Sequence, residues 1–194
     1  MHLAFDIFQG IGVAAAVGVR PFLPALVTGA LAAGNVEIHF NHTNYSFLQS
    51  LPFLLAMAVC VVLGLVIATR LGARERSAAE TVLGVISLAL GALLFAGSLA
   101  RGHYAAWPGL IGGVVCAAVG IAASLPLLRR VRARLDAEAA GALPLLAEGA
   151  AALAAGLSVI APPVGLIVLA LLVWLLLAGR RRAEQKYAGL RILR

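Results

Sequence analysis

Two ionisable residues interrupt segments of the sequence that are otherwise almost wholly apolar: Arg20 and Glu148. A charge at membrane depth costs about 2.5–3.5 kcal/mol on insertion scales, so it usually faces the protein interior or water and has a partner. Each residue lies about nine positions into the apolar part of its segment. We therefore expect the two side chains to meet at one depth and to form an ion pair.

The residues after Arg20 predict a second feature, a break in the helix. Pro21 disfavours helical geometry in the preceding residue, which is Arg20. Proline is well suited to the first position of a new helix, because its missing N–H would have no partner there. The new helix would direct free N–H groups and the positive end of its dipole toward the guanidinium. Pro24 indicates that the break is wider than one residue.

This arrangement predicts an anion site formed by Arg20, Pro21, Phe22 and Glu148. Transporters use broken helices in this way. Candidate ligands are a small carboxylate, a phosphate or a lipid phosphate group. The alternative is structural: Arg20 pairs only with Glu148, or with carbonyl groups freed by the prolines, and so locks the fold.

The histidines and cysteines, which could act in catalysis or bind a metal, do not occur in a pattern typical of either function. His39, His42 and His103 fall in polar intervals between apolar runs, and Cys60 and Cys116 fall inside apolar runs. No nucleophile with a base, paired carboxylates or phosphate-binding glycine loop occurs in a workable place. We assign no catalytic residue, no metal site and no cofactor, and an enzyme is unsupported.

The elements that must position the Arg20 site are membrane helices. The chain has 194 residues, of which 62% are hydrophobic and 12% charged, whereas a soluble domain carries about 25% charged residues. Apolar runs cover residues 49–69, 81–100, 109–128 and 164–179, close to the roughly 20 residues that span a bilayer. The expected fold is an all-α polytopic membrane bundle of five or six helices.

The first and last apolar segments are too long for single spans. Residues 3–34 would form a helix of about 48 Å, against a hydrocarbon core of about 30 Å, so this segment is broken by proline or re-entrant. The adjacent Pro162 and Pro163 divide residues 137–179 into a helical hairpin. A re-entrant first segment would place the N-terminus on the side opposite the C-terminus, and the sequence leaves this open.

Arginine clusters at the ends of the apolar runs predict the orientation. They include Arg70 and Arg74, the group 129–134, and the group 180–182, and such short basic loops stay cytoplasmic. Residues 1–179 are expected to form one transmembrane domain and 180–194 a basic cytoplasmic tail. The net charge of +7 therefore suits anionic lipid headgroups rather than nucleic acid. The sequence therefore predicts a multi-pass membrane protein with a cytoplasmic C-terminus.

Two local patterns refine the helix assignment. Ser77–Glu80 matches a capping box and places the start of a helix near Ala78. Small residues four apart, which let backbones approach closely in lipid, predict that the helix from Gly109 packs at the centre of the bundle; they are Gly109, Gly113 and Ala117, and Gly112, Cys116 and Gly120. The oligomeric state stays open, a homo-oligomer included.

The segments "GIGVAAAVGVRPFLPAL", "LFAGSLA", "RVRARLD", "APPVG" and "KYAGLRILR" resemble a family of small bacterial membrane proteins catalogued as domain of unknown function 4126. The last four of these segments look similar to its actinobacterial-type members. The resemblance covers most of the chain and implies a polytopic inner-membrane protein, without an activity. Our leading hypothesis is a transporter or lipid- or anion-binding membrane protein. The alternative is a structural or assembly protein that transports nothing.

Overall fold

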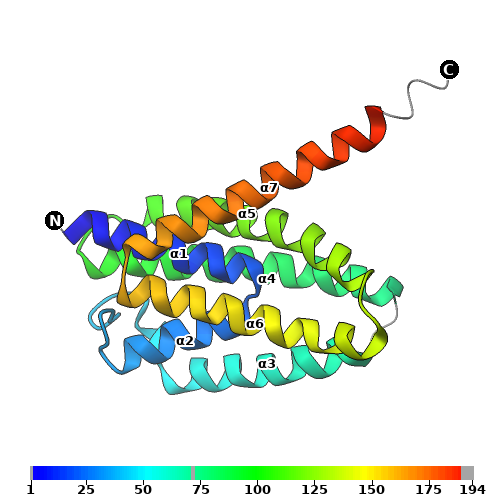
Figure 1. The fold of residues 1–194 in the computed structure, drawn as a ribbon. Helices are drawn as coiled ribbons and strands as arrows, with labels where there is room; N and C mark the ends of the chain where they lie inside the picture. Colours follow the sequence, from blue (N-terminus) through cyan, green and yellow to red (C-terminus); the bar gives the residue numbers. More distant parts are fainter. Residues whose placement is uncertain (1, 71–72, 189–194) are drawn as a thin grey trace.

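The computed structural model describes residues 2–70 and 73–188, within which the regular elements are helices and there is no strand (Figure 1). The elements in chain order are α1 (His2–Val19), α2 (Phe22–Ala33), a short 3-10 helix η1 (Ser46–Gln49), α3 (Leu51–Arg70), α4 (Ala73–Arg101), α5 (Trp107–Arg132), α6 (Ala137–Ile160) and α7 (Pro163–Ala188). The predicted all-α polytopic bundle is confirmed.

Five of these helices, α3 to α7, are long and apolar enough to cross a membrane. None of the residues in the α3 span is buried within the protein, and few in the α7 span are. Large apolar side chains on these two helices are exposed, including Leu55, Val62 and Trp174. In a bilayer such surfaces face lipid, which explains why the sequence tolerates so much exposed apolar area.

The first apolar segment is re-entrant. Helix α1 enters the bundle from one end, and α2 returns to that same end (Figure 1). Near this end Gly102, just after α4, lies against Asp6 of α1, and Gly29 of α2 lies against Leu48 and Leu54. The helix therefore breaks at Arg20 and Pro21, as the prolines predict, and of the two open alternatives the structure has the hairpin.

The long helices run between two ends of the bundle (Figure 1). We call one the basic end: it holds the end of α3, the start of α4, the α5–α6 connection and Gly179 of α7, which lies against Arg130 of α5. We call the other the histidine end: it holds the start of α1, residues 34–50, the loop after α4 and the α6–α7 turn. The tip of the α1–α2 hairpin points toward the basic end.

Helix α1 is the most enclosed helix, since Val13 to Val17 have no exposed surface. It packs against α4, α5, α6 and α7. The predicted small-residue stripes on α5 make this possible: Gly113 faces Gly91 of α4, and Gly120 faces Ala15 and Gly18 of α1. The stripes pack as predicted, but the helix they enclose at the centre is α1.

Two boundaries test the local sequence signals. The hairpin at Pro162 and Pro163 is confirmed, because α6 ends at Ile160 and α7 begins at Pro163. The capping box is wrong, because α4 begins at Ala73 and Ser77–Glu80 lies inside it. Interior residues have intrahelical partners, and Glu80 instead pairs with Arg129 of α5. Helix α7 continues through residue 179, and residues 189–194 of the predicted tail lie outside the described residues.

Candidate anion site at the tip of the hairpin

The α1–α2 connection consists of Arg20 and Pro21, at the tip of the hairpin. The Arg20 N–H donates to the Ala16 carbonyl at 3.2 Å, which completes the last turn of α1. Pro21 occupies the N-cap position of α2 with helical dihedral angles and makes no side-chain cap bond. Because Pro21 and Pro24 have no N–H, Phe22 and Leu23 provide the backbone donors of this first turn.

One of these donors binds a carboxylate from another helix. The Leu23 N–H donates to Oε2 of Glu148 in α6 at 3.4 Å. Glu148 is almost fully buried, with 7% of its surface exposed. A carboxylate is favoured at the positive end of a helix dipole, so Glu148 acts as a cap for α2 supplied by α6.

Arg20 lies close to this carboxylate but does not contact it. Its charge interacts through space with Glu148, and also with Arg132 of α5 and Glu80 of α4 near the basic end. The ion pairs among the described residues do not include Arg20 and Glu148. The two side chains therefore lie near each other, as predicted, but they form no salt bridge. The physical reason is that the Glu148 carboxylate accepts a hydrogen bond from the start of α2. The Arg20 guanidinium interacts electrostatically with several charged side chains and not with Glu148 alone.

The remaining predicted site residues, Pro21 and Phe22, are both buried. The Phe22 ring faces Gly64 of α3 and so covers the hairpin tip on the α3 side. The structure thus brings all four predicted residues to one place, where the N-terminus of α2, a guanidinium and a carboxylate converge.

Several polar groups on the hairpin lack partners. Three buried side-chain atoms of the described residues have no hydrogen bond: Gln9 Oε1, Arg20 Nε and Thr28 Oγ1. All three belong to α1, to α2 or to the connection between them. A buried polar group without a partner costs about 1–3 kcal/mol. The hairpin therefore contains buried polar atoms that have no hydrogen-bond partner within the protein.

Sequence reasoning missed a second arrangement of charges at the other end of the hairpin. Asp6 of α1 forms an ion pair with Arg101 at the end of α4, and Arg101 also donates to the Glu37 carbonyl. Asp6 is 1% exposed. The available signal was Asp6 itself, an acid near the start of an apolar helix, but its partner lies 95 residues away in the chain.

Further polar residues have simpler surroundings. Gln9 donates from Nε2 to the Val159 carbonyl of α6 at 3.1 Å and ties α1 to that helix. Cys60 and Cys116 are free thiols. No group of three or more metal-binding side chains occurs in the part of the chain that the structure describes.

Comparison with known proteins identifies a family. The model of a family described as "Domain of unknown function (DUF4126)" matches residues 7–182. This range includes the hairpin tip, the five candidate membrane spans and Arg101, while Asp6 lies just before it. The searches of the curated proteins and of the solved structures gave no significant match.

Proposed function

Because the chain belongs to the family with domain of unknown function 4126, whose description assigns no activity, we propose a function from the hairpin tip itself. The protein binds a small anion within the membrane and acts as a transporter or as a receptor for that anion. Arg20 supplies the charge, the N–H groups of Phe22 and Leu23 supply directed donors, and Glu148 is the built-in competitor of the ligand.

The observation that carries this proposal is the incomplete pairing of two opposite charges. Arg20 Nε is buried without an acceptor, while the neighbouring Glu148 holds a single long hydrogen bond to Leu23. A buried charge that serves only stability is usually paired and fully hydrogen-bonded. A ligand oxygen placed between Arg20 and the start of α2 would satisfy both donors.

The chemistry of Glu148 indicates the ligand class. Its carboxylate accepts from the amide that a ligand anion would use, so a carboxylate or a phosphate fits the same donor. The ligand and an ionised Glu148 repel each other at this position, so anion binding favours displacement or protonation of Glu148. Anion binding would thereby be coupled to a proton.

We infer that the ligand enters from the basic end, because the charges of Arg132 and Glu80 there interact electrostatically with Arg20. Short arginine-rich connections stay cytoplasmic, so we propose that the basic end and the C-terminus face the cytoplasm of a bacterium. The histidine end and the start of α1 would face outward. The basic clusters would then contact anionic lipid headgroups.

A thermal-shift experiment in neutral detergent tests the site. We would titrate inorganic phosphate and acetate at pH 8 against wild type, Arg20→Gln and Arg134→Gln, the last being an exposed arginine at the basic end. A ligand that binds only the folded state raises the apparent stability. We expect a rise in Tm in wild type and Arg134→Gln that is lost in Arg20→Gln.

A flux assay separates a transporter from a receptor. The same three proteins, reconstituted in liposomes, would be tested for uptake of the anion that shifts Tm. Uptake that depends on Arg20 supports transport. The proposal fails if neither anion shifts the Tm of wild type, or if Arg20→Gln retains the shift; Arg20 would then have a structural role.

A further inference from the structure

The helices α3 and α4 follow each other in the chain but do not pack along their length. Among the described residues, α3 packs against α2, η1 and α6, whereas α4 packs against α1 and α5. The α3 side chains that reach the hydrophobic core, Phe53 and Met57, belong to the half of α3 nearest the histidine end. The two helices are thus joined through the elements between them and not by direct contact.

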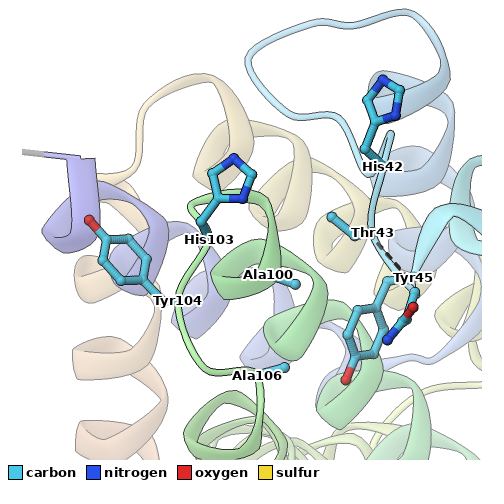
Figure 2. A pocket seen from close by; sticks show the side chains of 8 residues that line it. His42, Thr43, Tyr45, Ala100, His103, Tyr104 and Ala106 are labelled. Atoms are coloured by element: carbon cyan, nitrogen blue, oxygen red, sulfur yellow. Dashed lines mark hydrogen bonds between the residues drawn. The ribbon is translucent and has the colours of Figure 1, made fainter.

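At the histidine end, the segment of residues 34–50 fills the space between these two helices. Phe40 and Leu48 are fully buried, and both lie against Gly97 of α4. Thr43 Oγ1 donates to the Phe40 carbonyl at 2.8 Å, and Figure 2 shows this segment beside the end of α4. The hollow of about 360 Å³ there is lined by no arginine, lysine or carboxylate side chain, so it offers no fixed charge to an anion.

The hairpin tip lies closer to the basic end, where α2 has not yet begun. On α3 its level is that of Gly64, since a Cβ there would lie 3.8 Å from the Phe22 ring, with no other described side chain within 4 Å. On α4 the level is that of Gly84. This glycine lies against Ile121 of α5, one residue beyond the position that packs on the end of α1.

Apolar side chains of both helices are accessible at this level. Leu63 and Ile67 of α3 and Val82 and Val85 of α4 are between 47% and 64% exposed. Most apolar residues of α4 between positions 90 and 99 are instead buried. In a bilayer the exposed surfaces face lipid chains, so the hairpin tip borders a part of the bundle that is open to the membrane.

A cation lies at the inner end of these apolar surfaces. Arg20, two residues before Phe22, is partly buried, and its Nε has no acceptor. Its charge interacts with Glu80 and Arg132, which lie toward the basic end. Gly64, at the level of the tip, is about six residues or roughly 9 Å from the end of α3. A charged headgroup at the membrane surface therefore has a short distance to travel to Arg20.

We propose that the anion held at the hairpin tip is the phosphate headgroup of a membrane lipid, whose acyl chain lies between α3 and α4. This inference rests on the proposed function, because Arg20 binds the phosphate in both. Arg20 Nε and the first N–H groups of α2 donate to the phosphate oxygens. The acyl chain covers the exposed apolar side chains beside Gly64 and Val82.

A lipid phosphate and a free phosphate differ in how binding depends on an attached chain. Each methylene group that leaves water for an apolar surface strengthens binding roughly three- to fourfold. A site for a free anion uses the charge of Arg20 alone, so an added chain brings no gain. A site for a lipid gains affinity with each methylene group that reaches the surfaces of α3 and α4.

The test is a titration of inorganic phosphate and of methyl, butyl and hexyl phosphate at pH 8 in neutral detergent, with Kd obtained from the Tm shift. Gly64→Phe fills the space beside Phe22, and Gly64→Leu does so with a smaller side chain if the ring disturbs folding. Gly141→Phe is the matched control, because no atom lies within 4 Å of a Cβ at this glycine of α6. Arg20→Gln removes the phosphate donor.

In wild type and Gly141→Phe we expect Kd to fall roughly 30-fold from methyl to butyl phosphate. In the Gly64 variants inorganic and methyl phosphate should bind as in wild type, while the gain from the chain falls below about threefold. Arg20→Gln should bind none of the four compounds. Partition of the longer compounds into detergent is common to all variants, so the comparison between variants removes it.

A second measurement uses the unaltered chain in nanodiscs of phosphatidylcholine. Phosphatidic acid with a photoreactive diazirine on its acyl chain should label residues 62–67 and 82–85, and should label them less in Arg20→Gln. Phosphatidylcholine with the same diazirine is the control. Equal labelling of these residues by the two lipids would overturn the proposal.

The titration separates failure of this inference from failure of the proposed function. The lipid assignment is overturned if phosphate binds through Arg20 with an affinity that does not depend on chain length. It is also overturned if folded Gly64 variants keep the full gain from the chain. In both cases the anion site itself stands. If neither inorganic phosphate nor any alkyl phosphate binds, the proposed function fails and this inference fails with it.

Discussion

The two ends of the α1–α2 hairpin carry similar groups in different arrangements. At the histidine end Asp6 contacts Arg101, and the guanidinium also binds the Glu37 carbonyl. At the tip Glu148 binds the Leu23 amide, and Arg20 has a buried nitrogen without an acceptor. Both arrangements join the hairpin to a long spanning helix, α4 in one case and α6 in the other.

The difference distinguishes a structural contact from the site that we propose. In the first arrangement each charge is matched within the protein, so its main consequence is stability. In the second arrangement the charges are close but not in contact. A ligand that accepts a hydrogen bond from Arg20 could therefore gain binding free energy there. Each end of the hairpin has one arginine and one carboxylate, and the difference lies in how these two groups are paired.

The largest expected effect comes from breaking the matched pair. Asp6→Ala removes the acceptor from Arg101, which leaves a guanidinium with 20% of its side chain exposed and no counter-charge. Removal of one partner from a buried pair destabilises by about 3–5 kcal/mol. We would measure the free energy of unfolding in detergent. The reading of this pair as a structural lock is wrong if the loss is below about 1 kcal/mol, the usual value of an exposed pair.

The next effect concerns the close packing that places the hairpin tip. A Cβ at position 18 would collide with the Ala117 carbonyl of α5. Overpacking of this kind costs about 1–3 kcal/mol, so Gly18→Ala should lower the free energy of unfolding by that amount. Gly149→Ala is the control, because no atom lies within 4 Å of a Cβ there. Equal effects of the two substitutions would contradict the packing argument.

A smaller effect is expected at the tip itself. Glu148→Gln and Arg20→Gln should each change the free energy of unfolding by about 1 kcal/mol or less, because Gln can still accept from the Leu23 N–H and Arg20 forms no salt bridge. A double-mutant cycle between these positions should give a weaker coupling than the cycle between Asp6 and Arg101. A stronger coupling at the tip would indicate a structural lock at both ends.

The smallest effect is expected for the pair of Glu80 and Arg129. Its side chains are 27% and 57% exposed, and exposed pairs contribute about 0.2–1 kcal/mol. Glu80→Gln should therefore have little effect on the free energy of unfolding, and added salt should reduce that effect further. A loss as large as that of Asp6→Ala would show that this pair closes the basic end.

Much of the fold follows from local sequence. Membrane helices require apolar runs of a certain length, and prolines interrupt them, so the break at Pro21 and the turn at Pro162 were both predictable. The proximity of Arg20 and Glu148 was predictable as well, because charges within apolar runs are conspicuous and usually have a partner. The capping box at Ser77 misled because a local signal cannot show whether the preceding residues continue the helix.

The sequence by itself determined that this chain is a helical membrane bundle, where its first helix breaks and which charges lie at depth. Only the tertiary structure decided that the broken helix turns back, that Asp6 meets Arg101, and that Glu148 caps α2 rather than contacting Arg20. The physical reason is how far along the chain each feature depends on other residues. Helix length and breaks depend on neighbouring residues, whereas pairing depends on which distant helices pack side by side and which donor each carboxylate reaches.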